Sequence, residues 1–152
     1  MHKRALQVAL VVASLAVIGP TTATTASAAT PGVSRAVMTG PAEVPGPGDR
    51  NGFGRAVVDS SPLLNQVCVN IRYFGIDPPS GAHIHDAPAG VAGDIVVDLT
   101  PLIATSDPSY ISGCVPVDTA LARDIKQNPA EYYANLHNAA FPAGAIRGQL
   151  HG

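Results

Sequence analysis

The chain has 152 residues, with five histidines, two cysteines and a formal net charge of −2. This length is enough for a leader followed by one domain with a modest core. The nine lysines and arginines are scattered along the chain and form no polybasic stripe of the kind that neutralises phosphates. We therefore expect no nucleic-acid partner.

Residues 1–29 are predicted to be a signal peptide that is cleaved on export. A basic start precedes an apolar run at residues 5–18, and small residues at 26–28 allow cleavage near Ala28 or Ala29. The apolar run is too short to span a bilayer, which takes about 20 residues as helix, and no second run follows. We therefore expect a secreted, extracellular protein with no transmembrane segment.

Residues 30–33 are expected to form a flexible tail, and residues 34–152 a single β domain. Short runs rich in β-branched and aromatic residues alternate with turns rich in Pro, Gly, Asp and Ser. The predicted strands are 34–39, 54–60, 66–74, 82–85, 94–99, 110–117, 131–137 and 145–151. Residues 118–129 predict a short helix, because Leu121 and Ile125 lie four apart behind a capping Asp or Thr. The pattern indicates an all-β fold, an antiparallel β-sandwich or Greek-key barrel with one short helix.

The two cysteines, Cys68 and Cys114, lie in the part of the chain that is expected to be exported. In that environment a disulfide forms and persists. A pair of zinc ligands is disfavoured, because the short C-x-x-C spacing of zinc sites is missing. We predict a disulfide, which would stabilise the fold by roughly 4 kcal/mol on the chain-entropy estimate.

Alternation along four predicted strands separates polar from apolar side chains, and in the strand at 66–74 the polar row consists of Cys68, Asn70 and Arg72. Ile84 belongs to the apolar side of its strand, so His83 and His85 point together to the other side, about 6–7 Å apart. The strands at 131–137 and 145–151 repeat this alternation. Their polar rows consist of Tyr133, Asn135, His137, Arg147, Gln149 and His151. If the strands are neighbours, the rows form one polar surface with four histidines.

Two interpretations of His83, His85 and His137 stay open. The first is a transition-metal site, because imidazole nitrogens bind Zn and Cu, and three of them leave a fourth position open. The second is a structural role, in which the imidazoles hydrogen-bond backbone carbonyls and fasten the following loop, with Asp86 and Asn135 as partners.

No motif for catalysis accompanies these residues. No serine lies in a Gly-x-Ser-x-Gly elbow, and no twelve-residue loop offers calcium ligands at alternating positions. We expect no enzyme activity apart from one that a bound metal would support, and no cofactor other than Zn or Cu.

Several motifs and the spacing between them are similar to those of one known module. They are EVP at residues 43–45, the glycine-led strand at 52–58, His-Ile-His at 83–85 and YYANLHNAAFPAGAIRGQL at 132–150. On these motifs, residues 35–150 resemble the CHRD domain, which is repeated in chordin and present singly in many bacterial secreted proteins. The positions that match the family pattern are His83, Ile84, His85, Tyr133, Asn135, His137, Pro142, Gly144, Ile146, Arg147, Gly148 and Gln149.

The resemblance implies an extracellular β-sandwich module and no particular activity. Ala145 stands where the family usually has a glutamate, which removes the carboxylate expected beside Arg147, and Gly46 follows Pro45 where a second proline is common. The resemblance favours a secreted binding or structural module without catalytic activity, whose partner is an extracellular protein or a cell-wall component. The alternative is a secreted Zn- or Cu-binding protein with a three-histidine site.

Overall fold

Strands provide most of the regular structure in this computed structural model, which describes residues 32–105 and 108–152. They are β1 (Val33–Thr39), β2 (Phe53–Ser61), β3 (Gln66–Phe74), β4 (Gly81–Asp86), β5 (Asp94–Asp98), β6 (Tyr110–Pro116), β7 (Tyr132–His137) and β8 (Ile146–Gln149). The connections contain helix α1 (Thr119–Gln127) and the 3₁₀ turns η1 (Gly40–Ala42), η2 (Thr100–Thr105) and η3 (Pro129–Glu131). The predicted leader lies outside the described residues. Within those residues, no helix has the length and apolar character that a membrane crossing requires.

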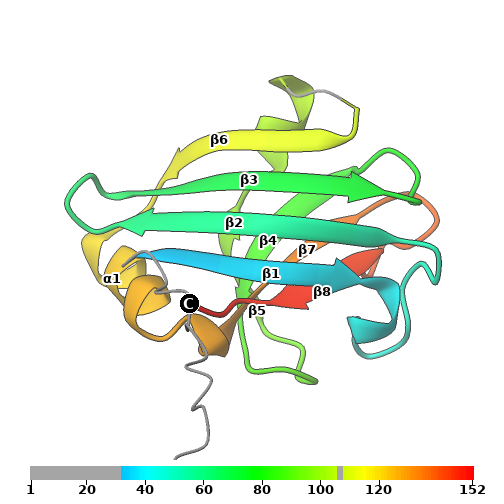
Figure 1. Cartoon of the computed structure of the whole chain (residues 1–152), viewed down its shortest axis with the longest axis horizontal. Coiled ribbons are helices and arrows are strands. Elements are labelled where there is room, and N and C mark those ends of the chain that lie inside the picture. Colours follow the sequence, from blue (N-terminus) through cyan, green and yellow to red (C-terminus); the bar gives the residue numbers. More distant parts are fainter. Residues whose placement is uncertain (1–31, 106–107) are drawn as a thin grey trace, which may run out of the picture.

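The strands form one eight-stranded antiparallel sheet in the order β5-β4-β7-β8-β1-β2-β3-β6. Figure 1 shows that the sheet curves strongly, with β1, β2, β3 and β6 in a near layer and β4, β5 and β7 behind them. The edge strands β5 and β6 are joined through η2. The predicted all-β fold with antiparallel strands and a short helix is confirmed.

The core lies between the two layers and takes every second residue of the strands. In β3, Val67, Val69, Ile71 and Tyr73 are buried, as the alternation predicted. Ile84 of β4 belongs to the same buried cluster from the rear layer. The residues between these positions therefore point away from the core and form the outer faces of the molecule.

Helix α1 packs at one end of the curved sheet (Figure 1). Asp118 caps it, because its side chain accepts a hydrogen bond from the backbone N–H of Leu121 at 2.8 Å. Ile125 is fully buried, and the hydroxyl of Ser60 in β2 donates to the Ala122 carbonyl at 2.7 Å. These contacts fix the helix against the sheet.

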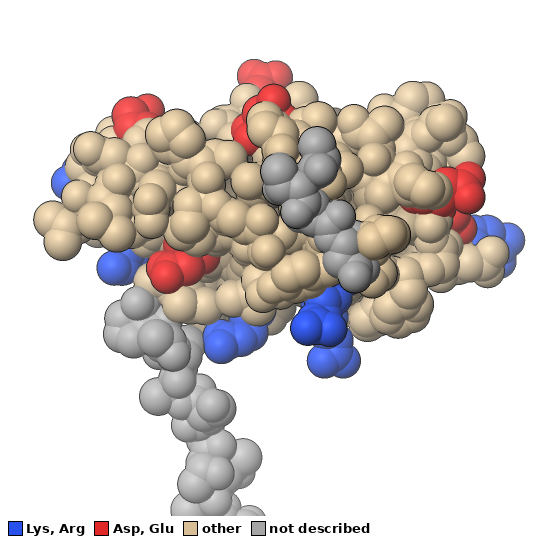
Figure 2. Space-filling view, turned by 90° about the horizontal axis from the view of Figure 1, so that it is seen from above, with Lys and Arg blue, Asp and Glu red and all other residues tan. Residues whose placement is uncertain are grey.

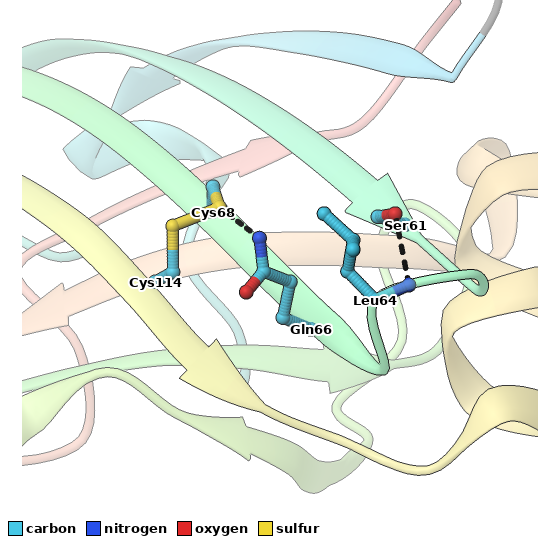
Figure 3. The surroundings of a disulfide bond; sticks show 5 residues. All are labelled: Ser61, Leu64, Gln66, Cys68 and Cys114. Carbon is cyan, nitrogen blue, oxygen red and sulfur yellow. Dashed lines mark hydrogen bonds between the residues drawn. A yellow bond between two sulfur atoms is a disulfide. The ribbon is translucent and has the colours of Figure 1, made fainter.

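A disulfide joins the neighbouring strands β3 and β6 (Figure 3). Cys68 and Cys114 are directly opposite each other in the strand register, with their Cα atoms 3.9 Å apart. Beside them, Gln66 donates a side-chain N–H to Cys68 Sγ at 3.3 Å, and the backbone N–H of Leu64 donates to Ser61 Oγ in the preceding turn. The predicted pairing is confirmed, and it bonds the edge strand β6 covalently to the sheet.

Candidate metal centre

The strand order places the polar rows of β4, β7 and β8 side by side. In the register, His83 is opposite Asn135, and Asn135 is opposite Arg147. The adjacent row consists of His85, Tyr133 and Gln149. Strand β4 and the consecutive strands β7 and β8 therefore form one continuous polar patch on the outer side of the rear layer.

Three imidazoles converge at one end of this patch. His83 and His85 come from β4, and His137 is the last residue of β7. The ring centroid of His83 lies 5.6 Å from that of His85 and 4.9 Å from that of His137. One nitrogen of each ring lies within 4.8 Å of the others. Gly81, opposite His137, leaves room for the rings, because an added Cβ would lie 3.2 Å from Cε1 of His83.

His85 and His137 each use Nδ1 to contact a backbone carbonyl outside the cluster. Nδ1–H of His137 donates to Pro142 at 3.0 Å, and Nδ1–H of His85 donates to Gly93 at 2.9 Å. A carbonyl only accepts, so the hydrogen of each contact sits on Nδ1. Nε2 of His137 is therefore left for the cluster, and Nε2 of His85 faces both the cluster and Asn135.

In His83 it is Nε2, and not Nδ1, that faces groups outside the cluster. Its Nε2 lies 3.4 Å from Oγ1 of Thr100 and 3.7 Å from Oδ1 of Asp98. Hydrogen bonds from Thr100 hold the pKa of the Asp98 carboxyl below its usual value, so a charged carboxylate faces Nε2 of His83 and favours the proton on that nitrogen. In this tautomer, Nδ1 of His83 carries the lone pair.

Two nitrogens of the cluster are buried and lack a hydrogen-bond partner among the described residues, namely Nδ1 of His83 and Nε2 of His137. Burial, above all, lowers the pKa of both imidazoles, and neighbouring imidazoles lower it further. Both rings are therefore neutral at pH 7 and keep a lone pair. Nε2 of His85 lies 3.1 Å from Oδ1 of Asn135, so an ion that binds this nitrogen would replace that contact.

Arg147 holds the loop at 87–93 against the polar patch. Its side chain is only 2% exposed, and it donates to the carbonyls of Val91 at 2.8 Å and Pro88 at 3.0 Å. The guanidinium carbon lies 3.3 Å from the centroid of the Tyr133 ring. A planar, permanently charged group thus bridges β8 and the loop.

Further polar side chains of the patch hold the same loop. Gln149 donates to the Ala87 carbonyl at 2.9 Å, and the Tyr133 hydroxyl accepts from the backbone N–H of Gly93 at 3.3 Å. His85 bonds to the carbonyl of Gly93. The loop is therefore bound at its two ends and in its middle.

Two residues lie elsewhere than the sequence predicted, namely Asp86, expected beside the polar rows, and His151, expected within them. Asp86 is exposed in a groove next to α1, because the two-residue period of β4 puts it on the same side as Ile84. His151 is exposed and pairs with Arg35 of β1. The polar patch is also not the exposed surface that the sequence predicted, because Asn135 within it is only 2% exposed.

Glu43 supplies a carboxylate near Arg147 that the sequence reasoning missed. It is 6% exposed and packs on Gly144, where an added Cβ would lie 2.5 Å from its oxygens. Burial raises the pKa of Glu43 to about 7, although the charge of Arg147 acts in the opposite direction. Its Oε1 atom is buried without a hydrogen-bond partner in the described part of the chain. The available sequence signal was the EVP motif, whose first residue is Glu43.

Sequence reasoning also missed Asp98, Thr100 and Pro142 as hydrogen-bond partners of the imidazoles. Pro142 belongs to a matched motif, but its carbonyl carries no side-chain signal. Asp98 was visible only as a carboxylate at the end of a strand. Its position beside His83 follows from the pairing of β4 with β5.

Comparison with known proteins identifies a family. The model of the family described as the CHRD domain matches residues 34–150, which include the three clustered histidines and all eight strands apart from the first residue of β1. No curated protein and no solved structure matches the chain.

Proposed function

The chain belongs to the CHRD domain family, and on that premise we propose that it is an exported module that binds a zinc or copper ion through His83, His85 and His137. Family membership supports an extracellular binding or structural module in general. Export is supported by the leader predicted at residues 1–29 and by the disulfide, which is typical of oxidising compartments.

The observation that carries the proposal is the pair of buried nitrogens without a partner, Nδ1 of His83 and Nε2 of His137. Leaving a buried polar atom without a hydrogen bond costs about 1–3 kcal/mol. A purely structural cluster would have to bear this cost twice. A metal ion removes it, because it accepts both lone pairs.

The hydrogen bonds outside the cluster support the same conclusion. Metal-binding imidazoles usually donate their other N–H to a carbonyl or a carboxylate, which fixes the tautomer and orients the ring. His85 and His137 donate to carbonyls, and His83 faces the Asp98 carboxylate. The three rings are thus oriented for binding before an ion arrives.

The spacing suits an ion after a modest adjustment. Zn–N bonds of about 2.0–2.1 Å place tetrahedral ligand nitrogens about 3.3 Å apart, whereas the nitrogens of the cluster lie within 4.8 Å of one another. The rings would move inward by roughly 1 Å on binding. Three imidazoles leave one position open, and nitrogen ligands favour Cu²⁺ over Zn²⁺.

A purely structural role is the competing function, and one observation favours it. His85 bonds to the Gly93 carbonyl and so holds the loop at 87–93. This contact uses Nδ1, and a metal at Nε2 would replace the contact of that nitrogen with Oδ1 of Asn135 at 3.1 Å, so the two roles are compatible at His85 once Asn135 turns away. They differ at His83 and His137, whose buried lone pairs have no hydrogen-bond partner among the described residues.

The test is calorimetric titration of the tag-free protein, lacking its leader, with Zn²⁺ and with Cu²⁺. We expect one ion per chain in the wild type and none in His137→Ala. His151→Ala is the matched control, because it removes an exposed histidine outside the cluster and should bind like the wild type.

Circular dichroism establishes that each variant is folded, and His137→Gln replaces His137→Ala if the latter is not. Absence of binding to the folded wild type would overturn the proposal. Equal loss of binding in His137→Ala and His151→Ala would also overturn it, since it would indicate binding by surface histidines in general.

A further inference from the structure

The outer face of β1, β2 and β3 gathers three arginines that are far apart in the sequence. Arg35, Arg55 and Arg72 are all exposed, because alternation turns their neighbours into the core. In the register, Arg55 is directly opposite Arg72. Arg35 is opposite Val57 and therefore diagonal to Arg55, at a spacing of about 7–8 Å. We call these three residues the arginine face; the sequence alone had shown them only as scattered charges.

Within the described residues, no Asp or Glu side chain lies at ion-pair distance from the arginine face. The ion pair found there joins His83 and Asp98 instead. Asp59 lies on the same outer face and, like Arg55, is diagonal to Arg35 in the register. Like charges directly opposite each other on adjacent strands destabilise a sheet. Figure 2 shows several basic side chains along the lower edge of the molecule, with an acidic group at the left of that edge and further acidic groups along the upper edge.

Aromatic rings support the guanidinium groups of the arginine face. The guanidinium carbon of Arg55 lies 5.9 Å from the centroid of the Phe53 ring, and that of Arg72 lies 5.2 Å from the centroid of Tyr110. Phe53 stacks on Phe74, whose side chain is 63% exposed. Apolar rings and cationic groups therefore alternate on one open surface.

Two shallow grooves meet at Arg55. The first is lined by Phe53, Arg55, Arg72, Tyr73, Phe74 and Ser109. The second is lined by Arg35, Ala36, Val37, Arg55, Ala56, Val57 and His151. Because Arg55 belongs to both, the grooves form a track that crosses the strands of the near layer.

We propose that the arginine face binds an anionic polysaccharide along this track. Guanidinium groups pair with carboxylate or sulfate through two parallel hydrogen bonds, and the exposed rings offer apolar area to the C–H face of a sugar. A polymer with repeated charges would contact all three arginines and relieve the repulsion between Arg55 and Arg72. The arginine face lies on the near layer and the histidine cluster on the rear layer, so the two sites are independent (Figure 1).

A polysaccharide fits this face better than a nucleic acid does. Proteins that bind single strands stack successive bases on separate aromatic rings. Phe53 and Phe74 stack on each other instead, with centroids 5.1 Å apart. Family membership also supports an extracellular setting, where anionic polysaccharides are common surface polymers.

The test measures binding of the tag-free protein to polygalacturonate, dextran sulfate, neutral dextran and single-stranded DNA by biolayer interferometry. We expect binding to polygalacturonate, dextran sulfate or both, weakened by salt, and none to neutral dextran. The two anionic polymers separate a carboxylate preference from a sulfate preference. His137→Ala should bind like the wild type, because the histidine cluster is not involved.

Arg55→Gln/Arg72→Gln should lower the affinity at least about tenfold. The matched control is Arg50→Gln/Arg123→Gln, which makes the same charge change at exposed positions outside the arginine face and should stay within about twofold. The first double variant should unfold at the same temperature as the wild type or higher, since it removes the opposed charges.

Three outcomes would overturn the proposal. The first is absence of binding to both anionic polysaccharides at low salt. The second is an equal loss of affinity in the two double variants, which would reflect net charge only. The third is binding to single-stranded DNA without binding to either polysaccharide, which would identify a nucleic-acid surface.

Discussion

Nδ1 of His83 and Nε2 of His137 are buried atoms without a hydrogen-bond partner in the part of the chain that the structure describes, on rings whose centroids lie 4.9 Å apart. Nδ1–H of His137 donates to the Pro142 carbonyl, and Nε2 of His83 faces the Asp98 carboxylate at 3.7 Å, so neither ring turns over without losing a contact. The two lone pairs are thus fixed in the same small space. A bound cation would satisfy both.

Metal binding should stabilise the folded protein. An ion that binds only the folded state at a free concentration one hundred times its Kd adds about 2.7 kcal/mol to the free energy of unfolding. Thermal unfolding with Zn²⁺ and with EDTA measures this difference. We expect a higher Tm with Zn²⁺ for the wild type and no shift for His83→Ala; identical curves for the wild type would contradict the account.

The carboxylate beside His83 should tune the metal affinity. Asp98→Asn replaces the charged group that faces Nε2 of His83 with a neutral one, and losses of such outer partners typically cost 10- to 100-fold in affinity. We expect a loss of about tenfold in Zn²⁺ affinity by calorimetry. Asp94→Asn, which removes an exposed charge from the same strand, is the control and should change little. Equal effects of the two substitutions would assign the loss to net charge.

Glu43 should make stability depend on pH in an unusual direction. Its pKa in the folded state is about 7, above the ordinary value of 4.5, so the folded state holds the proton more tightly than the unfolded chain does. Its contribution is complete below pH 4.5 and is lost as the pH rises through 7. The wild type should therefore lose stability relative to Glu43→Gln between pH 5 and pH 8.

Urea unfolding of the two proteins in the same buffers measures this difference, and histidine titration cancels because both proteins share it. A difference that stays constant from pH 5 to pH 8 would show that Glu43 ionises as it does in water. A difference that grows in favour of the wild type would reverse the sign of the effect.

Arg147→Lys should loosen the loop at 87–93. Lysine keeps the charge but loses the planar fork that reaches the Pro88 and Val91 carbonyls together. We expect the free energy of unfolding to fall by about 2 kcal/mol, the typical value of a hydrogen bond to a charged group. Amide hydrogen exchange should accelerate at residues 89–93. Arg123→Lys on α1 is the control, and unchanged exchange in Arg147→Lys would contradict the role of the guanidinium.

Strand alternation was sufficient to predict the core and the direction of the histidines. Val67, Val69 and Ile71 are buried, and His83 and His85 lie on the side opposite Ile84, because a two-residue period depends only on local backbone geometry. The cysteine pair was also predictable, since the expected export leaves few alternatives for two cysteines.

Strand order and loop position were not predictable, and they decide the rest of the site. Asn135 and Arg147 are buried because the loop at 87–93 folds over them, which no feature of their own strands indicates. The convergence of Arg55 and Arg72 depends on the register of β2 and β3. Register is set by turns and core packing together, so a single sequence does not reveal it.

The central claim is that three imidazole nitrogens bind one ion, and long-range ¹H–¹⁵N NMR of the histidine rings tests it most directly. One equivalent of Zn²⁺ should shift the resonances of Nδ1 in His83 and of Nε2 in His85 and His137, while their other nitrogens stay protonated. The ring nitrogens of His151 should not shift, because this residue lies outside the cluster. Unchanged nitrogen resonances in His83 and His137 at that stoichiometry would contradict the account.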